Sequence, residues 1–263
     1  MHSKESKQWI FSVYYGSIKF FIGNFDIFRY NGHDKNSDKE CMNVNVSGKY
    51  IYVTYDGIQY QLCNQRCRDW THPYEYQGNG SMLTNAGCGI FAIANAACYL
   101  GGEKVIPEEL ADFSCACGGR GDDGTDRPAL LSAMQEKGLA EKYGFRYEFD
   151  GLRNDLDTLH AHLMNGGAAL CNLRVGHIVA LVGGRIAPNG EKQVLAADPF
   201  SESADPKVID AVRECIPGSE VISPIPNVRG EKAKGYLCSY ALFWASLATV
   251  RDFNLLHRIF PRT

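Results

Sequence analysis

The sequence predicts an α+β fold in which a helical half precedes a half built of short antiparallel strands. Between about residues 85 and 165, apolar runs of helical length are bounded by glycine and proline. From residue 168 to residue 197, short apolar runs of β-forming residues alternate with turn residues. Helices followed by strands, rather than a regular strand and helix alternation, indicate the α+β class.

The N-terminal residues 9–62 are typical of β structure. Apolar residues alternate along residues 18–22, and two β-forming runs at 49–55 and 58–62 flank Asp56-Gly57. Asp-Gly between two such runs is a strong signal for a two-residue hairpin turn. We therefore expect a hairpin centred on these two residues.

Four helices are expected in the middle of the chain, and each has a start or stop signal. They cover residues 88–100, a segment beginning at 106–111, residues 128–137 and residues 155–164. Proline and two glutamates occupy the first turn of the second helix, and glycine follows the other three. On the fourth helix His160 and His162 are two positions apart, so we expect them to face different sides and to be solvent-exposed.

Three strands are expected next, at residues 168–173, 176–182 and 193–197, with a turn around Pro188 and Asn189 between the last two. Residues 201–235 are rich in proline, glycine and charge and are expected to be a loop, and residues 236–256 return to ordered structure.

The change in pattern near residue 62 suggests two parts. We expect residues 1–62 to form a β-rich N-terminal extension or subdomain and residues 63–263 to form the main domain.

Composition excludes several classes of partner. The 263 residues are 45% hydrophobic and 22% charged, and the net charge is −3 with a pI near 6.2. This composition permits a buried core, but the chain has no excess of positive charge that would indicate binding to nucleic acid or to an anionic membrane. No apolar run reaches the ~18 residues that span a bilayer, and no signal peptide begins the sequence as written. We expect a soluble protein, cytoplasmic as written or secreted if a leader has been removed, with the oligomeric state left open.

Ten cysteines lie in varied contexts, several of them inside apolar segments, which fits a reduced protein better than a disulfide framework. Two close pairs, Cys63 with Cys67 and Cys115 with Cys117, leave pairing open. Neither pair has the two-residue spacing of a zinc knuckle, and the aspartates of residues 122–126 lack the ligand spacing of a calcium loop. No metal and no cofactor is expected.

Cys88 is the strongest candidate for a functional residue. It lies between Gly87 and Gly89, directly before an apolar helix. The first N–H groups of a helix are unpaired and carry the positive end of its dipole, so a thiolate is stabilised there. Flanking glycines allow a substrate backbone to approach closely. This pattern is typical of a cysteine nucleophile, although the cysteine could equally be a packing residue.

His177 and Asp198 supply the remaining groups of a triad. His177 begins one expected strand and Asp198 ends the next. If these strands pair across the turn near Pro188, the position opposite His177 falls at about 199 or 200, so the two side chains meet at one rim of the sheet. A histidine oriented by a carboxylate and brought to a thiol can act as base and then as acid.

These residues resemble a known family. The Gly-Cys88-Gly helix start, Gly176-His177 at a strand start and Asp198-Pro199 at the end of the next strand are similar to the papain-like cysteine peptidases related to the bacteriocin-processing, double-glycine-leader peptidases. The likeness includes the segment from Gln65 to Trp70 and Gly124-Thr125, and it covers about residues 65–200.

The resemblance implies a papain-like fold and a cysteine peptidase or amide hydrolase acting on a peptide or protein substrate through a thioester. It also implies that Gln65 donates to the oxyanion with the backbone N–H of Cys88. The classical leader peptidases place this glutamine six residues before the cysteine, where this chain has Met82, so Gln77 and Asn85 remain rival donors.

Two alternatives use the same fold. An acyltransferase or transamidase would use the same triad with an amine in place of water, and a non-catalytic peptide-binding module would keep only the fold. The complete set of Cys88, His177 and Asp198 favours an enzyme over the binding module.

Overall fold

A computed structural model describes residues 47–173, 176–200, 212–224 and 236–261. These residues belong to one compact unit that extends from Asn45 to the C-terminus. The β pattern expected at residues 18–22 lies outside the described residues.

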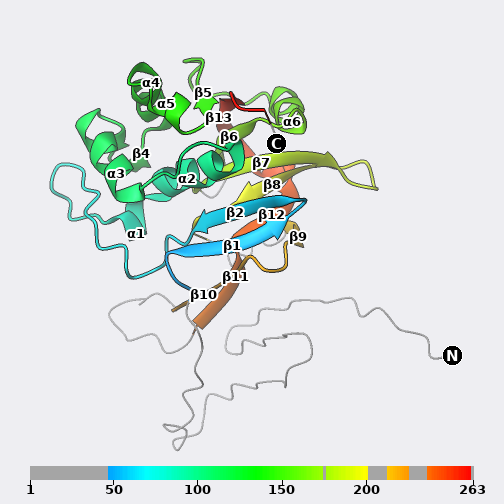
Figure 1. The fold of residues 1–263 in the computed structure, drawn as a ribbon, viewed down its shortest axis with the longest axis horizontal. Coiled ribbons are helices and arrows are strands. Elements are labelled where there is room, and N and C mark those ends of the chain that lie inside the picture. Colours follow the sequence, from blue (N-terminus) through cyan, green and yellow to red (C-terminus); the bar gives the residue numbers. More distant parts are fainter. Residues whose placement is uncertain (1–46, 174–175, 201–211, 225–235, 262–263) are drawn as a thin grey trace, which may run out of the picture. The chain divides into compact units, whose positions relative to one another are not determined.

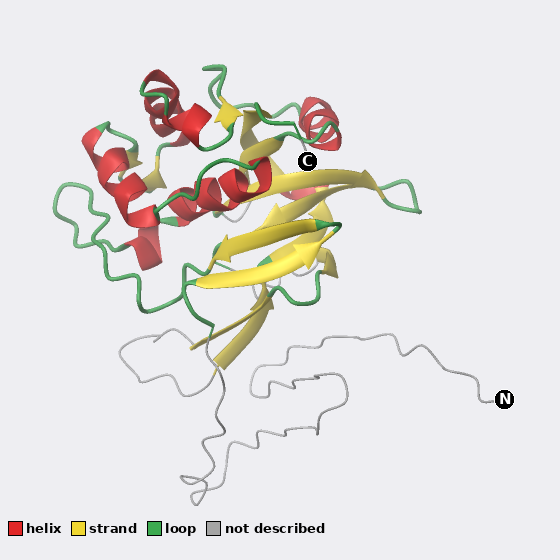
Figure 2. Ribbon diagram, viewed as in Figure 1, coloured by secondary structure: helices red, strands yellow, loops and turns green. Residues whose placement is uncertain are grey.

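Helices α1 to α5 of the described part lie near one another, and α6 lies apart from them beside the strands of the main sheet (Figures 1 and 2). The helices are α1 (Leu83–Ala86), α2 (Cys88–Leu100), α3 (Pro107–Ala116), α4 (Arg127–Glu136), α5 (Leu139–Lys142) and α6 (Leu156–Met164). Helices α2, α3, α4 and α6 match the four expected helices, whereas the short α1 and α5 carry no periodic signal that sequence reasoning could use.

The main sheet has seven strands in the order β5-β13-β6-β7-β8-β12-β9, and every described pairing within it is antiparallel. Its strands are β5 (Phe145–Arg146), β6 (Ala168–Leu173), β7 (Ile178–Ile186), β8 (Lys192–Ala197), β9 (Val212–Cys215), β12 (Leu242–Ser246) and β13 (Val250–Arg258). The α+β class and the antiparallel pairing are therefore confirmed.

Within the described residues, three two-stranded sheets accompany the main sheet. They are formed by β1 (Tyr50–Tyr55) with β2 (Ile58–Cys63), by β3 (Arg120–Gly121) with β4 (Gly124–Thr125), and by β10 (Glu220–Pro224) with β11 (Tyr236–Tyr240). Asp56 and Gly57 both have positive φ at the tip of the first hairpin, as the two-residue turn requires.

Strands β9 and β10 correct the sequence prediction. They fall within residues 201–235, which were expected to be loop. The prediction is wrong at these strands because each is short and pairs with a strand that follows it in the chain, β12 for β9 and β11 for β10. Residues 201–211 and 225–235 lie outside the described residues.

The two faces of the main sheet bury different helices. Alternate residues of β6 and β7 point to opposite sides, so Leu170 and Ala180 join the cluster around α2, while Cys171 and Val179 join the cluster around α6. Helix α2 is buried along nearly its whole length because the sheet covers one side and the β1–β2 hairpin covers another.

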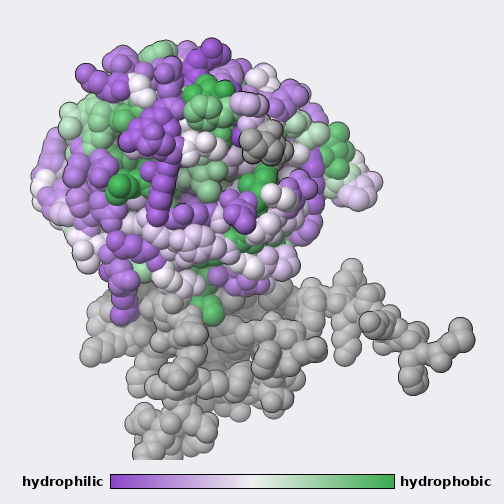
Figure 3. All heavy atoms as spheres, in the orientation of Figure 1, coloured by the Kyte–Doolittle hydropathy of each residue, from purple (hydrophilic) through white to green (hydrophobic). Residues whose placement is uncertain are grey.

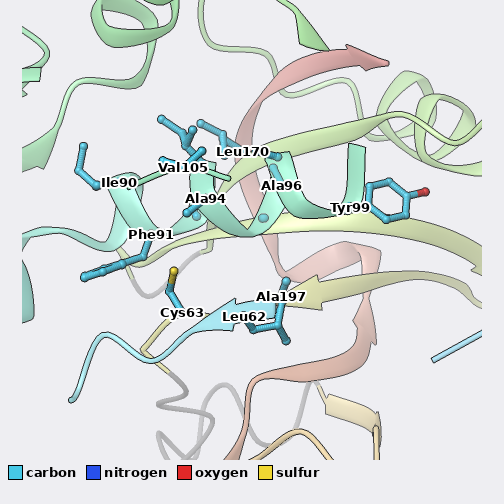
Figure 4. Close-up of a cluster of buried hydrophobic side chains, with 14 of the residues drawn as sticks. Leu62, Cys63, Ile90, Phe91, Ala94, Ala96, Tyr99, Val105, Leu170 and Ala197 are labelled. Carbon is cyan, nitrogen blue, oxygen red and sulfur yellow. The ribbon is translucent and has the colours of Figure 1, made fainter. Parts of the chain in front are cut away.

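The hairpin belongs to this core. Leu62 and Cys63 of β2 and Ala197 of β8 lie on the same side of α2 as the Phe91 ring (Figure 4). The Cys63 N–H donates to Asn95 Oδ1 at 2.8 Å, which ties β2 to the middle of the helix. The hairpin thus packs against α2, although it falls almost entirely within the expected N-terminal part of residues 1–62.

The two histidines of α6 correct another expectation. His160 is 5% exposed, and its Nε2 lies 3.0 Å from the carbonyl oxygen of Arg185. His162 is half-buried, and its Nε2 lies 3.0 Å from the carbonyl oxygen of Ala168. Both rings pair with backbone groups of β6 and β7, against which α6 packs, so the prediction of solvent exposure was wrong.

The surface is mixed. On the face of the described part that Figure 3 shows, hydrophilic residues dominate and hydrophobic side chains appear in small separate groups. None of the helices in the described residues combines the length and the apolarity that a bilayer crossing requires.

Candidate active site

Cys88 is the first residue of α2, directly after the short helix α1. Gly87 joins the two helices, and a Cβ atom at this position would lie 2.6 Å from the carbonyl oxygen of Leu83. Only glycine therefore allows the tight connection that starts a new helix at the cysteine. The apolar run that follows is buried between the sheet and the hairpin, which holds the first turn in place.

The thiol of Cys88 lies in an environment that favours the thiolate. Burial alone would raise its pKa, but hydrogen bonding and charge from His177 lower the pKa, as do the backbone N–H groups of Ile178 and Gly89. The net pKa is below the ordinary value of 9.0. A thiolate at the positive end of a helix is the reactive form of cysteine.

His177 lies directly before β7, at the end of the connection from β6. The Leu173 N–H donates to the carbonyl oxygen of His177 at 2.9 Å, and the Gly176 N–H donates to the Leu173 carbonyl at 2.8 Å. Gly176 has a φ of 81°, which favours glycine at this point of the turn. These contacts fix the histidine at the rim of the sheet.

Asp198 follows the last residue of β8. Its N–H donates to the carbonyl oxygen of Ala241 at 2.8 Å, and the residue is 1% exposed. Strands β7 and β8 pair with Ala180 opposite Ala197. Continuing this register brings residue 200 opposite His177, in agreement with the position expected from the sequence.

The histidine and the aspartate form a close pair. His177 Nε2 lies 2.6 Å from Asp198 Oδ1. Because Nε2 faces the carboxylate, Nδ1 is the ring nitrogen that remains for an interaction with the Cys88 thiol. Burial would lower the pKa of His177, but the Asp198 charge and its hydrogen bond, together with Cys88, raise the pKa to about 10.

Phe200 is a site residue that sequence reasoning missed. Its N–H donates to Asp198 Oδ1 at 2.8 Å, and its ring centroid lies 5.6 Å from that of His177. The Arg66 guanidinium lies over the Phe200 ring, 4.3 Å from its centroid. The only sequence signal was its position two residues after the aspartate.

Gln65 is buried at 2% exposure, close to both α1 and the segment after Asp198. Its N–H donates to the carbonyl oxygen of Pro199 at 2.6 Å, and its Nε2 lies 3.2 Å from the carbonyl oxygen of Thr84. Gln65 Oε1 is buried and has no hydrogen-bond partner in the structure. The side chain amide thus lies against the helix that leads into Cys88.

The two rival oxyanion donors lie in other environments. Gln77 is exposed in a turn and has a φ of 50°. Asn85 is exposed, and its Oδ1 accepts the Met82 N–H at 2.8 Å, so it caps helix α1. Of the three candidates, only Gln65 is buried.

Eight cysteines of the described part are free thiols: Cys63, Cys67, Cys88, Cys98, Cys115, Cys117, Cys171 and Cys215. Among the residues that the structure describes, no three histidine, cysteine, aspartate or glutamate side chains come together as metal ligands. The other two cysteines lie outside the described side chains.

Comparison of the chain with models of protein families, with curated proteins and with solved structures finds no match.

Proposed function

We propose that this chain is a cysteine peptidase or related amide hydrolase of papain-like fold, with Cys88, His177 and Asp198 as its triad. One observation carries the proposal. His177 Nε2 lies 2.6 Å from a buried carboxylate, and the same histidine lowers the pKa of the helix-terminal thiol. A thiol, an imidazole and a carboxylate in this sequence of contacts are the groups that nucleophilic acyl transfer requires.

The direction of the pKa changes supports a thiolate and imidazolium pair. The pKa of Cys88 is lowered and that of His177 is raised to about 10, and both changes favour the form in which the proton lies on His177. The thiolate is the reactive form of the cysteine. Asp198 stabilises the positive imidazolium and keeps its Nδ1 directed at the sulfur.

The proposed reaction has two stages. The Cys88 sulfur attacks the amide carbonyl carbon, the C–N bond breaks, and the His177 proton goes to the leaving amine. A water molecule then gives a proton to neutral His177 and adds to the thioester carbonyl. The C–S bond breaks, which releases the carboxylic acid and restores the thiolate and imidazolium. The Cys88 backbone N–H and the Gln65 amide are the proposed donors to the oxyanion in both stages.

Selective alkylation of Cys88 tests the proposal. The native protein is treated with a low dose of iodoacetamide at pH 7, and the labelled cysteines are identified by peptide mapping. We expect Cys88 to react first, although it is less exposed than Cys115, because its pKa is lowered. Cys115 is the internal control, since it is exposed but its pKa is raised by burial of its sulfur and by neighbouring acids.

The activity assay uses a peptide mixture digested from unrelated proteins, with new termini identified by mass spectrometry. The unmodified chain should generate new termini, and Cys88→Ala should not. The variant Cys98→Ser is a matched control, because Cys98 lies on the same helix and pairs only with backbone groups of β2. Uniform labelling of the cysteines, or activity that survives in Cys88→Ala, would contradict the proposed function.

A further inference from the structure

A chain of three hydroxyl groups lies beside the first turn of α2. The Tyr74 hydroxyl is 2.9 Å from Ser114 Oγ and 2.9 Å from Thr125 Oγ1. Tyr74 and Ser114 are both 0% exposed. None of the three takes part in the chemistry proposed for Cys88, so the buried polar chain needs another explanation.

Thr125 lies directly against the residue that follows the nucleophile. A Cβ atom on Gly89 would lie 2.5 Å from Thr125 Cβ and 2.6 Å from Thr125 Oγ1. The threonine side chain therefore fills the space in which any other residue at 89 would have its own side chain. Because the N–H of Gly89 helps to lower the pKa of Cys88, the position of Thr125 bears on the thiolate.

A buried arginine holds the same hydroxyl chain in place. Arg120 is 5% exposed, its Nε donates to the carbonyl oxygen of Tyr74 at 3.0 Å, and its guanidinium lies 4.9 Å from the centroid of the Tyr74 ring. Its Nη1 donates to the carbonyl oxygen of Gly124 at 3.0 Å. One side chain thus ties Tyr74 to β4.

Strand β4 contacts the backbone on both sides of the nucleophile. Thr125 meets Gly89, and a Cβ on Gly124 would lie 3.6 Å from the carbonyl oxygen of Ala86. Gly124 has a φ of 117°, a conformation that only glycine adopts without strain. The strand therefore spans the start of α2 from residue 86 to residue 89.

We propose that Tyr74 and Thr125 are positioning residues for the Cys88 nucleophile. The Tyr74 hydroxyl holds the Thr125 side chain in one rotamer, and Thr125 in turn holds the Gly89 N–H toward the sulfur. This inference rests on the proposed function, since it concerns the same cysteine. Small displacements of a reactive group lower the reaction rate strongly. Tyr74 and Thr125 can therefore affect the reactivity of Cys88 although they act only through packing and one hydrogen bond.

The experiment measures the pH dependence of Cys88 alkylation by iodoacetamide in the full chain. Tyr74→Phe and Thr125→Val remove hydroxyl groups and keep most of the packing. We expect both variants to move the midpoint of the rate profile to higher pH. Well below the midpoint, each unit of that shift lowers the alkylation rate by about tenfold. Thr125→Ser keeps a hydroxyl group and should recover most of the rate.

Tyr147→Phe is the matched control. Tyr147 is 1% exposed, and its hydroxyl accepts a hydrogen bond from the Gly151 N–H, apart from the chain formed by Tyr74. This variant loses a buried phenol hydroxyl in the same way, and its alkylation profile should match that of the unmodified chain. Equal profile shifts in Tyr147→Phe and Tyr74→Phe would mean that general destabilisation causes the effect, and would overturn the inference.

The alkylation profiles of the Tyr74 and Thr125 variants can also contradict the inference. Unchanged profiles in folded Tyr74→Phe and Thr125→Val would overturn the inference and leave the proposed function intact. If Tyr74→Phe fails to fold, the two Thr125 variants decide, because equal profiles for valine and serine would exclude a role for the hydroxyl. Slow alkylation of Cys88 in the unmodified chain would overturn the inference and the proposed function together.

Discussion

His177 Nε2 lies 2.6 Å from Asp198 Oδ1, and the two residues are joined through the antiparallel pairing of β7 with β8. The carboxylate is almost fully buried, whereas the histidine side chain is 17% exposed. A buried carboxylate beside a partly accessible imidazole fixes the orientation of the ring and stabilises its positive charge.

Asp198→Asn should lower turnover by at least about tenfold while the protein stays folded, because the amide cannot stabilise the imidazolium or select the same tautomer. His177→Ala should cost more, since it also removes the proton donor. Steady-state kinetics and circular dichroism of both variants check this. Loss of folding in Asp198→Asn with normal activity per folded molecule would show that Asp198 only closes the strand.

The dependence of stability on pH should reveal the coupled pair. His177 has a raised pKa, so its contribution is complete below pH 6.5 and is lost as the pH rises through about 10. Cys88 has a lowered pKa, so its contribution is present above pH 9.0 and is lost as the pH falls through its folded value. Between these limits, a rise in pH decreases the contribution of His177 to the free energy of unfolding and increases that of Cys88, so the two changes oppose each other.

The two changes should therefore partly cancel, so between pH 7 and pH 9 the pair should add less slope to the free energy of unfolding of the unmodified chain than His177 alone would add. Cys88→Ala leaves the Asp198 contribution to the His177 pKa in place, so that variant should lose stability relative to the unmodified chain as the pH rises over this range. Urea titrations at pH 7, 8 and 9 measure the difference. Parallel pH profiles would mean that no proton is shared between the two residues.

The oxyanion donor can be tested with three alanine variants. Gln65→Ala should lower turnover by ~10²–10³ with less effect on substrate binding. Gln77→Ala should change nothing, because its side chain is exposed in a turn. Asn85→Ala should cost about 1 kcal/mol of stability through the lost bond to Met82 and leave the chemistry intact. A large kinetic loss at Gln77 or Asn85 alone would assign the donor differently.

Gly89→Ala should abolish turnover or folding, because the added Cβ would overlap Thr125. The double variant Gly89→Ala with Thr125→Gly removes the overlapping side chain and should recover stability relative to Gly89→Ala alone. Thermal unfolding of the two single variants and the double variant measures the coupling. Additive effects would indicate that the two residues do not meet.

Much of the fold could be predicted because its signals are local. The apolar run of α2 ends at Gly101, where the structure has a φ of 80°, and Asp56-Gly57 marks its own hairpin. The positions of Cys88, His177 and Asp198 could be predicted for the same reason, because each residue lies at an end of a helix or strand that the sequence marks clearly. The resulting geometry agrees with the register expected for β7 and β8.

The parts that could not be predicted depend on partners distant in the chain. His160 is buried because its ring meets a carbonyl of Arg185 on β7, which no pattern within α6 can indicate. Strand β9 is four residues long and forms through pairing with β12. Thr125 contacts Tyr74 across 51 positions, so its relation to the nucleophile could not be read from the motif around Cys88.

The division of the site between α2 and the β7–β8 pair has a consequence for folding. Helix α2 and its hairpin are close in sequence and can associate early, whereas His177 reaches Cys88 only after the sheet has docked on the helix, a contact of high sequence separation that forms more slowly. Until then the cysteine has an ordinary thiol without its base. If Cys88 is the proposed nucleophile, its reactivity should therefore develop only when the sheet has packed against helix α2, and a partly unfolded chain should not react selectively at this cysteine.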